Sequence, residues 1–582
     1  MAQLRSITLR NFKGIGEHAV KVPMRPITLL FGPNSAGKST VLQAMQYARE
    51  ILKRNNVNPD RTMAGGDAID LGGFEGLVHR HDLTRTVEMT FEIAISGDGL
   101  SSTMASAARS EIERAIDELT RGTTEQRYSS TDDLRQLKRD ERAELASLQG
   151  QLDALSWQDV GSHVSTASVE LRVGWDRERV CAFVQRLCIG LNGEPFGEVI
   201  AEGAGHSPFI ALQHDHSLIR TIDSGRTKVD LAETGSEIEG GELRRAWLEW
   251  TEPGLPIYMM ETDGLRFDQN LAINFGEAER ADIGVVWLRI LDQALLGPVR
   301  LLTEAMDSMR YLGPVREVPR RGFQPHRHPS EHRWASGLGA WDALHRHLDS
   351  STGSGDEVFN SVRRWLTETD CLDLGVGIEI FDVREVPENH PLMDALLKAA
   401  LEQDDLEQGF VRREILAPMQ ALPMRRKLRL IDAATDTEID AHDLGVGVSQ
   451  VIPVVVGAIE PGFSVFSVEQ PELHIHPKVQ VALADLFVEQ IKRLPGQFLL
   501  ETHSEHLLLR LLRRVRETAE GKEASPARGL KPGDLSVVVV QAVPTDDGPD
   551  RVVFFPIPVT EDGDFNVVWP DGFFPERGEE LF

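Results

Sequence analysis

The stretch that decides the fold is GPNSAGKS, residues 32–39, which fits the pattern G-x-x-x-x-G-K-[ST] without a mismatch. Residues 26–31 before it are mostly apolar and typical of a buried strand, and residues 39–45 after it open a helical pattern. Glycines allow backbone N–H groups to curl around phosphates, and a helix N-terminus favours negative charge. The segment therefore predicts a site for a nucleoside triphosphate. A chance glycine-rich turn is the alternative, and the flanking strand and helix count against it.

Two side chains of this loop have distinct predicted roles. The Lys38 ammonium would neutralise phosphate oxygens, and the Ser39 hydroxyl would be a ligand of Mg²⁺. The cofactors predicted from the loop are ATP and Mg²⁺. The nucleotide-binding residues predicted in this segment are Asn34, Ser35, Ala36, Gly37, Lys38, Ser39 and Thr40.

Length and charge limit the classes of protein. At 582 residues the chain predicts several domains, and 62 basic against 91 acidic residues give a net charge of −29. Such a charge argues against a protein that coats DNA over a wide face, although a local groove stays open. Arginines in residues 310–333 and 510–516 could line that groove, and the second group also fits an ordinary solvated helix face.

The cysteines, the longest apolar run and the N-terminal residues bear on the cellular compartment. The three cysteines, Cys181, Cys188 and Cys371, form no metal-binding pattern and fit small buried side chains in a reducing environment. The longest apolar run, residues 451–459, is too short for a membrane span. The N-terminal residues alternate as a strand and carry no signal-peptide pattern. We therefore expect a cytoplasmic protein.

A carboxylate at the end of a second buried strand should complete the nucleotide site. Residues 463–468 read as such a strand and lead into Glu469-Gln470-Pro471-Glu472, which predicts Glu469 as the residue on the metal side. An ordinary strand with an acidic turn is the alternative. Most of the chain separates Lys38 from Glu469, so the nucleotide domain must be split around large insertions.

The predicted insertions differ in pattern from the strands around them. Residues 104–119 and 134–155 are charged and helical, and their leucine spacing fits either a short coiled-coil hairpin or a pair of surface helices. Residues 318–340 look like a loop, and residues 357–368 and 392–403 read as helices. The predicted division is 1–100 (ATPase part with the phosphate loop), 101–160 (helical hairpin), 161–317 (β lobe and long helix), 318–426 (loop and helical insertion) and 427–582 (C-terminal ATPase part).

Several separate blocks carry a resemblance to a known group of proteins. They are residues 9–13 (LRNFK), 311–316 (YLGPVR), 443–450 (DLGVGVSQ), 469–477 (EQPELHIHP), 501–504 (ETHS) and 569–574 (WPDGFF). With the phosphate loop they make the chain resemble ABC-type ATPases of the SMC, RecF and OLD kind. The resemblance is greatest to ATPase subunits of bacterial anti-phage systems such as Septu and PARIS.

The resemblance implies an α/β fold, namely a split ABC-type P-loop ATPase domain. It would combine a parallel core sheet and an antiparallel β lobe with a short helical-hairpin insertion and a second helical insertion. A signature loop with Gly445 and Gly447, opening a helix from Ser449, would contact the γ-phosphate held by another subunit. A plain glycine turn is the alternative reading of that loop.

Three residues are predicted to serve the chemical step by the same resemblance. His503 would donate to the γ-phosphate from the switch loop. Gln470 stands where the group has a glutamate that polarises the attacking water, and Glu472 could be the base if the turn at Pro471 brings it back. We therefore expect slow hydrolysis. His474 and His476 lack further ligands at zinc spacing and favour a loop role.

The function expected from these features is an ATP-driven switch. It would act as a homodimer or higher homo-oligomer, away from membranes, and control an effector protein that is a nuclease or toxin, with nucleic acid as a further candidate partner. The alternatives are an OLD-like nuclease and an SMC- or RecF-like DNA repair ATPase. The C-terminal acidic residues lack the preceding glutamate that the nuclease would need, and residues 104–155 are short for the arms of an SMC protein.

Overall fold

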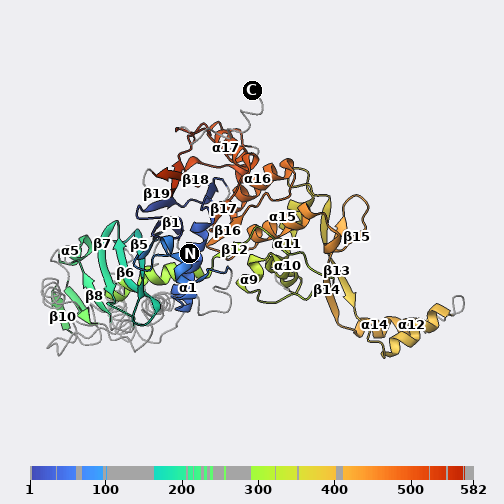
Figure 1. Ribbon diagram of the computed structural model, residues 1–582. Coiled ribbons are helices and arrows are strands. Elements are labelled where there is room, and N and C mark those ends of the chain that lie inside the picture. Colours follow the sequence, from blue (N-terminus) through green and yellow to red (C-terminus); the bar gives the residue numbers. More distant parts are fainter. Residues whose placement is uncertain are drawn as a thin grey trace, which may run out of the picture.

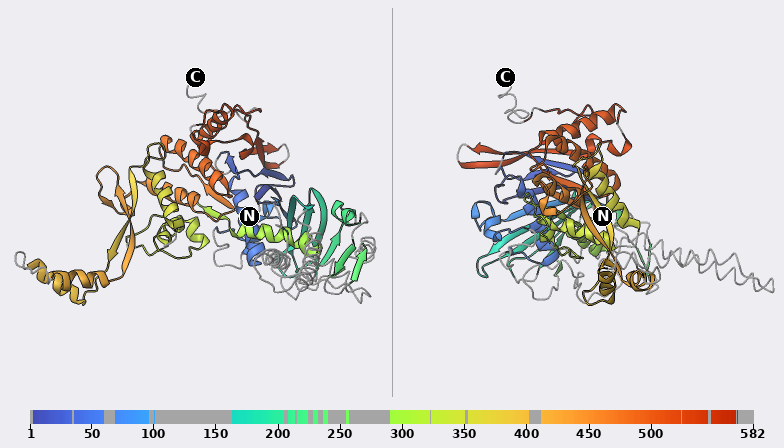
Figure 2. Two further views of the ribbon diagram at one scale, coloured as in Figure 1. Left: turned by 180° about the vertical axis from the view of Figure 1, so that it is seen from behind. Right: turned by 90° about the vertical axis from the view of Figure 1, so that its right-hand side faces the viewer.

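The computed structural model describes residues 3–33, 36–59, 69–95, 100, 163–204, 208–213, 215–223, 228–231, 236–239, 255–256, 290–321, 323–349, 353–401, 411–523, 525–545, 548–567 and 569. These residues form a central α/β body with an antiparallel β lobe on one side and an elongated arm on the other (Figures 1 and 2). None of the helices in these ranges combines the length and hydrophobicity needed to span a bilayer.

The central sheet contains both the strand that precedes the phosphate loop and the strand that ends at Glu469. Its strands, in spatial order, are β12 (Arg310–Leu312), β16 (Val465–Glu469), β17 (Gln497–Glu501), β3 (Ile27–Phe31), β18 (Leu535–Thr545) and β19 (Gly548–Ile557). All neighbouring pairs are parallel except β18 and β19. Every residue of β3 is buried, as expected of a central parallel strand covered on both faces.

Helices cover both faces of this sheet. Successive side chains of β3 point to opposite faces, and each face packs against a different set of helices. Leu30 belongs to the hydrophobic core shared with α1 (Ser39–Arg54) and α8 (Gly297–Asp307). Leu29 and Phe31 point into the opposite core. That core includes residues of α10 (Leu338–Asp349), α11 (Gly353–Thr367), α15 (Val446–Ile459), α16 (Pro477–Arg493) and α17 (Glu505–Ala519).

The β lobe is a curved antiparallel sheet on the α1 side (Figure 1). Its order is β11 (Leu255–Pro256), β8 (Phe209–Leu212), β7 (Glu194–Ile200), β6 (Cys181–Leu191), β5 (Thr166–Asp176), β4 (Val87–Ala94), β1 (Gln3–Arg10) and β2 (Val20–Pro23). The burial of β4 alternates strictly between buried and half-buried positions, so one face of the lobe packs on the core. The sheet and the lobe together confirm the predicted α/β class with parallel and antiparallel parts.

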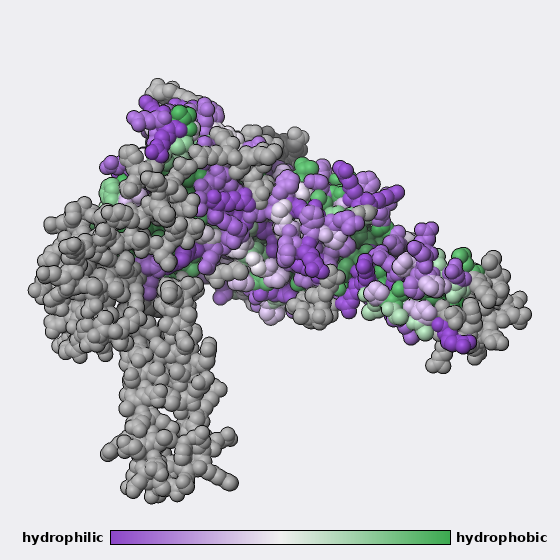
Figure 3. All heavy atoms as spheres, turned by 90° about the horizontal axis from the view of Figure 1, so that it is seen from below, coloured by the Kyte–Doolittle hydropathy of each residue, from purple (hydrophilic) through white to green (hydrophobic). Residues whose placement is uncertain are grey.

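The arm extends away from the body on the α15 side (Figure 1). The strands β13 (Val376–Arg384) and β14 (Met424–Asp432) pair along their whole length, and β15 (Glu438–Ile439) adds to β14. The outer end carries α12 (Pro391–Leu401), a π-helical turn at Val411–Leu416 and α14 (Ala417–Ala421). Hydrophobic side chains lie among polar ones there (Figure 3), and the exposed ones include Leu396, Leu397 and Leu416.

Some predicted elements differ from those of the structure. The helical hairpin predicted at 101–160 lies outside the described residues. The stretch 318–340, predicted as a loop, contains α9 (Glu331–Ala335), which begins where Ser330 accepts a hydrogen bond from the Arg333 N–H. The long helix predicted within residues 161–317 is described from residue 290 and includes a π-helical turn at Asp292–Leu296. The divisions between domains stay predictions.

Candidate nucleotide-binding site

The phosphate loop leaves β3 through a glycine that no other residue could replace. Gly32 has φ +148°, and a Cβ built on it would lie 2.1 Å from the carbonyl oxygen of Val540. Gly37 also has a positive φ, +97°. The helix α1 then begins at Ser39, directly after Lys38. Of the other predicted loop residues, Ala36 and Thr40 are buried beside this turn, and Asn34 and Ser35 lie outside the described residues.

Lys38 is buried, and its ammonium donates to loop carbonyls. Its Nζ lies 3.0 Å from the oxygen of Gly32 and 2.9 Å from that of Pro33. It also lies 3.7 Å from Glu501 Oε1, and both side chains are almost fully buried. Burial lowers the pKa of Lys38, and the negative charge of Glu501 partly opposes this. The Lys38 ammonium therefore stabilises the loop conformation by bonding two carbonyls of the loop.

Glu501 was not among the predicted site residues, and it contacts both key side chains of the phosphate loop. Its Oε2 accepts a hydrogen bond of 2.7 Å from the Ser39 hydroxyl, in addition to the ion pair with Lys38. Glu501 ends β17, which lies between β3 and β16. An acidic residue that ends an apolar strand was a usable signal in the sequence, the same signal that identified Glu469.

Glu469 ends the next strand and is the register partner of Glu501. Its Oε1 accepts a hydrogen bond of 2.8 Å from the Tyr311 hydroxyl. Burial and then the charge of Glu501 raise the pKa of Glu469 to about 7. A buried carboxylate (Glu501) and a half-buried one (Glu469), beside a serine hydroxyl, make up the hard oxygen donor set that Mg²⁺ prefers. The residues present therefore fit Mg²⁺, with Ser39 and Glu469 as predicted and Glu501 in addition.

Arg316 joins the acidic turn to the helix that follows the signature loop. Its guanidinium donates to the carbonyls of Glu469 at 2.7 Å and Gln470 at 3.2 Å. It also donates to the backbone carbonyl of Gln450. The side-chain amide of Gln450 in turn accepts from the Arg316 N–H and donates to the Arg316 carbonyl. Burial lowers the pKa of Arg316 to about 10. This arginine is a structural clamp between α15 and the end of β16.

The arginine groups proposed for a nucleic-acid groove are mostly engaged within the chain. Arg310 donates to the carbonyls of Gly457 and Glu460, and its guanidinium lies 4.2 Å from the centre of the Trp334 ring. Arg510 and Arg514 both bind the buried carboxylate of Asp485. With Arg316 buried as well, much of each group makes contacts within the chain, and a local nucleic-acid groove stays a prediction.

The turn after β16 and the switch loop are bonded to each other. Glu472 accepts hydrogen bonds from the Thr502 hydroxyl at 2.8 Å and from the backbone N–H of His503 at 2.7 Å. Gln470 has a left-handed backbone with φ +45°, and its N–H donates to the carbonyl of Glu501 at 2.7 Å. The carboxylate of Glu472 thus positions the switch loop. The catalytic roles of Gln470, Glu472 and His503 stay predictions.

The histidines of this region differ in setting. The His503 side chain is exposed, and burial of part of the ring together with the charge of Lys38 lowers its pKa. A neutral imidazole can still donate one hydrogen bond. His476 accepts from the N–H of Lys478 and caps α16, so its predicted loop role is confirmed. His474 is exposed in the turn before it, with φ +61°.

The predicted signature residues occupy different environments. The helix begins at Val446, three residues earlier than predicted, so Gly447 lies in its first turn. A Cβ on Gly447 would lie 2.6 Å from the carbonyl oxygen of His474, which shows that this glycine allows the turn to approach. Ser449 is buried, and its hydroxyl donates to the carbonyl of Val446. Gly445 and Val446 are exposed, Val446 to 62%.

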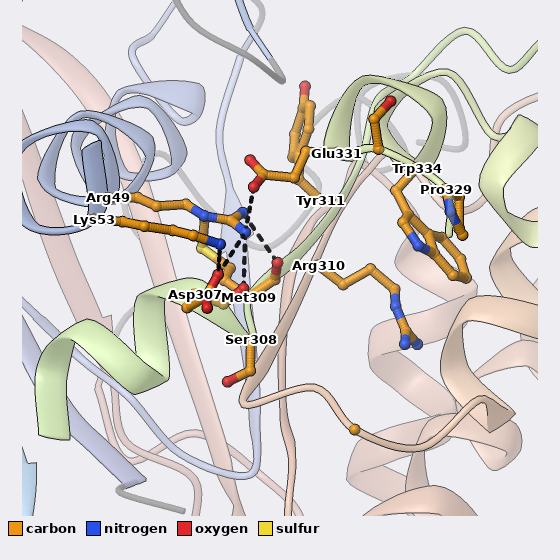
Figure 4. Close-up of a pocket in the computed structure, with 12 residues that line it drawn as sticks. Arg49, Lys53, Asp307, Ser308, Met309, Arg310, Tyr311, Pro329, Glu331 and Trp334 are labelled. Atoms are coloured by element: carbon orange, nitrogen blue, oxygen red, sulfur yellow. Dashed lines mark hydrogen bonds and ion pairs between the residues drawn. The ribbon is translucent and has the colours of Figure 1, made fainter. Parts of the chain in front are cut away.

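A cavity of about 360 Å³ is lined by Tyr311 and by residues of α1, α8 and α9. Figure 4 shows Arg49 and Lys53 of α1 beside Asp307, with Glu331 near Arg49, while Arg310 and Trp334 line another part of the wall. Arg49 also donates to the carbonyls of Asp307 and Met309. Both acidic side chains of the wall, Asp307 and Glu331, are paired with the cations of α1.

Comparison with known families supports the nucleotide-binding interpretation at both ends of the chain. Residues 6–154 match the family described as AAA domain, and residues 385–508 match the family described as AAA ATPase domain. The first match contains the phosphate loop, and the second contains Glu469 and the switch loop. Two separated parts of the chain are thus similar to AAA-type ATPase sequences. A search of curated proteins by sequence gave no match.

Solved structures of SMC heads are similar over most of their length. One is an SmcHead bound to the C-winged helix domain of ScpA, at 11% identity and a TM-score of 0.35, covering 95% of this chain and 98% of that one. Another is the SMC head domain from Thermotoga maritima, at 8% identity and a TM-score of 0.31, covering 96% and 99%. These scores are too low to define the fold, which rests on the sheets described above.

Proposed function

We propose that this protein is an SMC-like ATPase that binds Mg-ATP at the phosphate loop and hydrolyses it slowly. The observation that carries the proposal is the meeting of Lys38 and Ser39 with Glu469 and Glu501 at the ends of adjacent parallel strands. Mg²⁺ supplies charge neutralisation at the phosphates when it is bound. Lys38 would bind phosphate oxygens, and the switch loop held by Glu472 would present His503 to the terminal phosphate.

Slow turnover follows from the residue after Glu469. Gln470 can orient a water molecule by hydrogen bonding but cannot take up its proton. The one nearby carboxylate that could replace it in the turn, Glu472, is already bonded to Thr502 and His503. Both features favour an enzyme that stays in its ATP-bound form for a long time. That behaviour suits a switch better than a motor.

We further propose that ATP joins two copies of the chain through the signature loop. Gly445 and Val446 are exposed at the start of α15, where the loop could reach nucleotide on a second copy. Gly447 packs against its own chain, so a substitution there would disturb the fold. Val446→Arg avoids this problem, because Val446 is exposed in the single chain and the larger arginine side chain would block close approach of a second copy.

The experiment is light scattering of the wild type and Val446→Arg with no nucleotide, with ADP and with ATP. We expect ATP to raise the mass of the wild type to at least a dimer and to leave Val446→Arg monomeric with unchanged ATP affinity. Val180→Arg is the matched control, because Val180 is 67% exposed in the β lobe. A wild type that hydrolyses ATP while strictly monomeric would refute the association.

The biological role proposed for the switch is control of a nuclease or toxin in anti-phage defence. It is supported by the resemblance of the sequence blocks to ATPase subunits of such systems. The exposed leucines at the end of the arm offer one candidate contact for a protein partner. Co-expression with the product of a neighbouring nuclease gene, followed by affinity purification, tests this role. Failure of all neighbouring products to co-purify with the ATP-bound protein would count against it.

A further inference from the structure

Glu501 lies where a metal ion next to the phosphate loop would be bound. Its carboxylate accepts the Ser39 hydroxyl at 2.7 Å and lies 3.7 Å from the Lys38 ammonium. The side chain is only 8% exposed, so the carboxylate is kept out of bulk water by its surroundings. A buried carboxylate in such a place is costly unless a cation or hydrogen-bond donors compensate it.

The neighbouring strand supplies a second carboxylate at the same level. Glu469 and Glu501 are register partners at the ends of the parallel strands β16 and β17, and such strands lie about 4.8 Å apart. Lys38 is the cation nearest to Glu501, and its ammonium is shared with two loop carbonyls. Three carboxylates, those of Glu469, Glu472 and Glu501, lie near two cations, Lys38 and Arg316, and a divalent cation would neutralise the remaining negative charge.

We propose that Glu501 is a second acidic ligand of the magnesium ion, acting together with Ser39 and Glu469, either directly or through a water molecule. The inference deepens the proposed nucleotide site and rests on it. Mg²⁺ keeps several waters and takes one or two protein carboxylates with substrate phosphates, which fits this donor set.

A competing hypothesis for the same contacts predicts a different effect of removing the Glu501 charge on nucleotide binding. Glu501 could instead be a latch that occupies Ser39 and Lys38 and must leave before nucleotide binds. Removal of a ligand would raise the Mg²⁺ requirement, whereas removal of a latch would tighten nucleotide binding in every condition. The variant Glu501→Gln separates the two, because it removes the charge and keeps an oxygen that can accept the Ser39 hydroxyl.

The test measures binding of the non-hydrolysable analogue AMP-PNP by calorimetry, in EDTA and over a series of Mg²⁺ concentrations. In EDTA we expect Glu501→Gln to bind AMP-PNP at least as tightly as the wild type, because a negative charge near the phosphates is removed. The Mg²⁺ concentration that gives half of the gain in affinity should rise about ten- to a hundredfold. Binding of Mn²⁺, followed by electron paramagnetic resonance in the presence of AMP-PNP, should weaken by a similar factor. Glu520→Gln, at an exposed carboxylate paired with Lys522, is the matched control and should change neither value.

Each other outcome overturns the proposal. An unchanged Mg²⁺ requirement in Glu501→Gln would show that Glu501 is no ligand, and tighter AMP-PNP binding in EDTA and in Mg²⁺ alike would identify a latch. In both cases the nucleotide site itself would stand, since the wild type binds. A wild type that fails to bind AMP-PNP would overturn the proposed function and this inference with it.

Discussion

Lys38→Ala should remove most of the affinity for ATP while the fold is kept. The ammonium makes two hydrogen bonds to loop carbonyls and an ion pair with Glu501. Nucleotide binding would redirect these donors to phosphate oxygens. A hydrogen bond to a charged group is worth about 1.5–3 kcal/mol, so the dissociation constant should rise about ten- to a hundredfold.

The same substitution has a second effect that the structure makes visible. It leaves Glu501 buried without its nearest cation, which should cost about 1–3 kcal/mol of local stability. The double variant Lys38→Ala/Glu501→Gln removes both charges and should regain part of that loss, because the two side chains are coupled. Thermal unfolding of the two variants in EDTA measures the recovery.

Calorimetric titration with Mg-ATP is the assay for Lys38→Ala. Lys53→Ala is the matched control, since Lys53 lies near the end of the same helix and pairs with Asp307 on the surface. It should bind ATP as the wild type does. Unchanged affinity in Lys38→Ala would refute the assignment of the loop. Equal losses in both variants would show that α1 as a whole was disturbed.

Two further predictions concern the acidic turn. Gln470→Glu should speed steady-state ATP hydrolysis, measured by phosphate release, because it restores a group able to take up a proton; a slower variant would refute the assigned role of Gln470. In EDTA, the thermal stability of the wild type relative to Glu469→Gln should fall as pH rises from 5 to 7.5. The folded state keeps Glu469 protonated up to a pKa of about 7, whereas the unfolded pKa is about 4.3, so ionisation costs the folded state more. A difference that does not change with pH would contradict this.

Local sequence determined the nucleotide-binding unit. The strand, loop and helix around residues 26–45 follow from a run of apolar residues, two glycines and a lysine, all of which act on near neighbours. The strand before Glu469 and the alternating strand at the N-terminus could be predicted for the same reason. The helical hairpin at 101–160 lies outside the described residues, and the catalytic roles of Gln470, Glu472 and His503 stay predictions.

Only the tertiary structure decided which strand ends meet. β17 lies between the phosphate-loop strand β3 and the acidic strand β16, and this order places Glu501, rather than Glu469, in contact with Ser39 and Lys38. It likewise buries Arg316 as a clamp where charge patterning had suggested a groove. Strand order depends on long crossovers and on packing between segments far apart in the chain. The order of the strands therefore cannot be predicted from the spacing of motifs along the sequence.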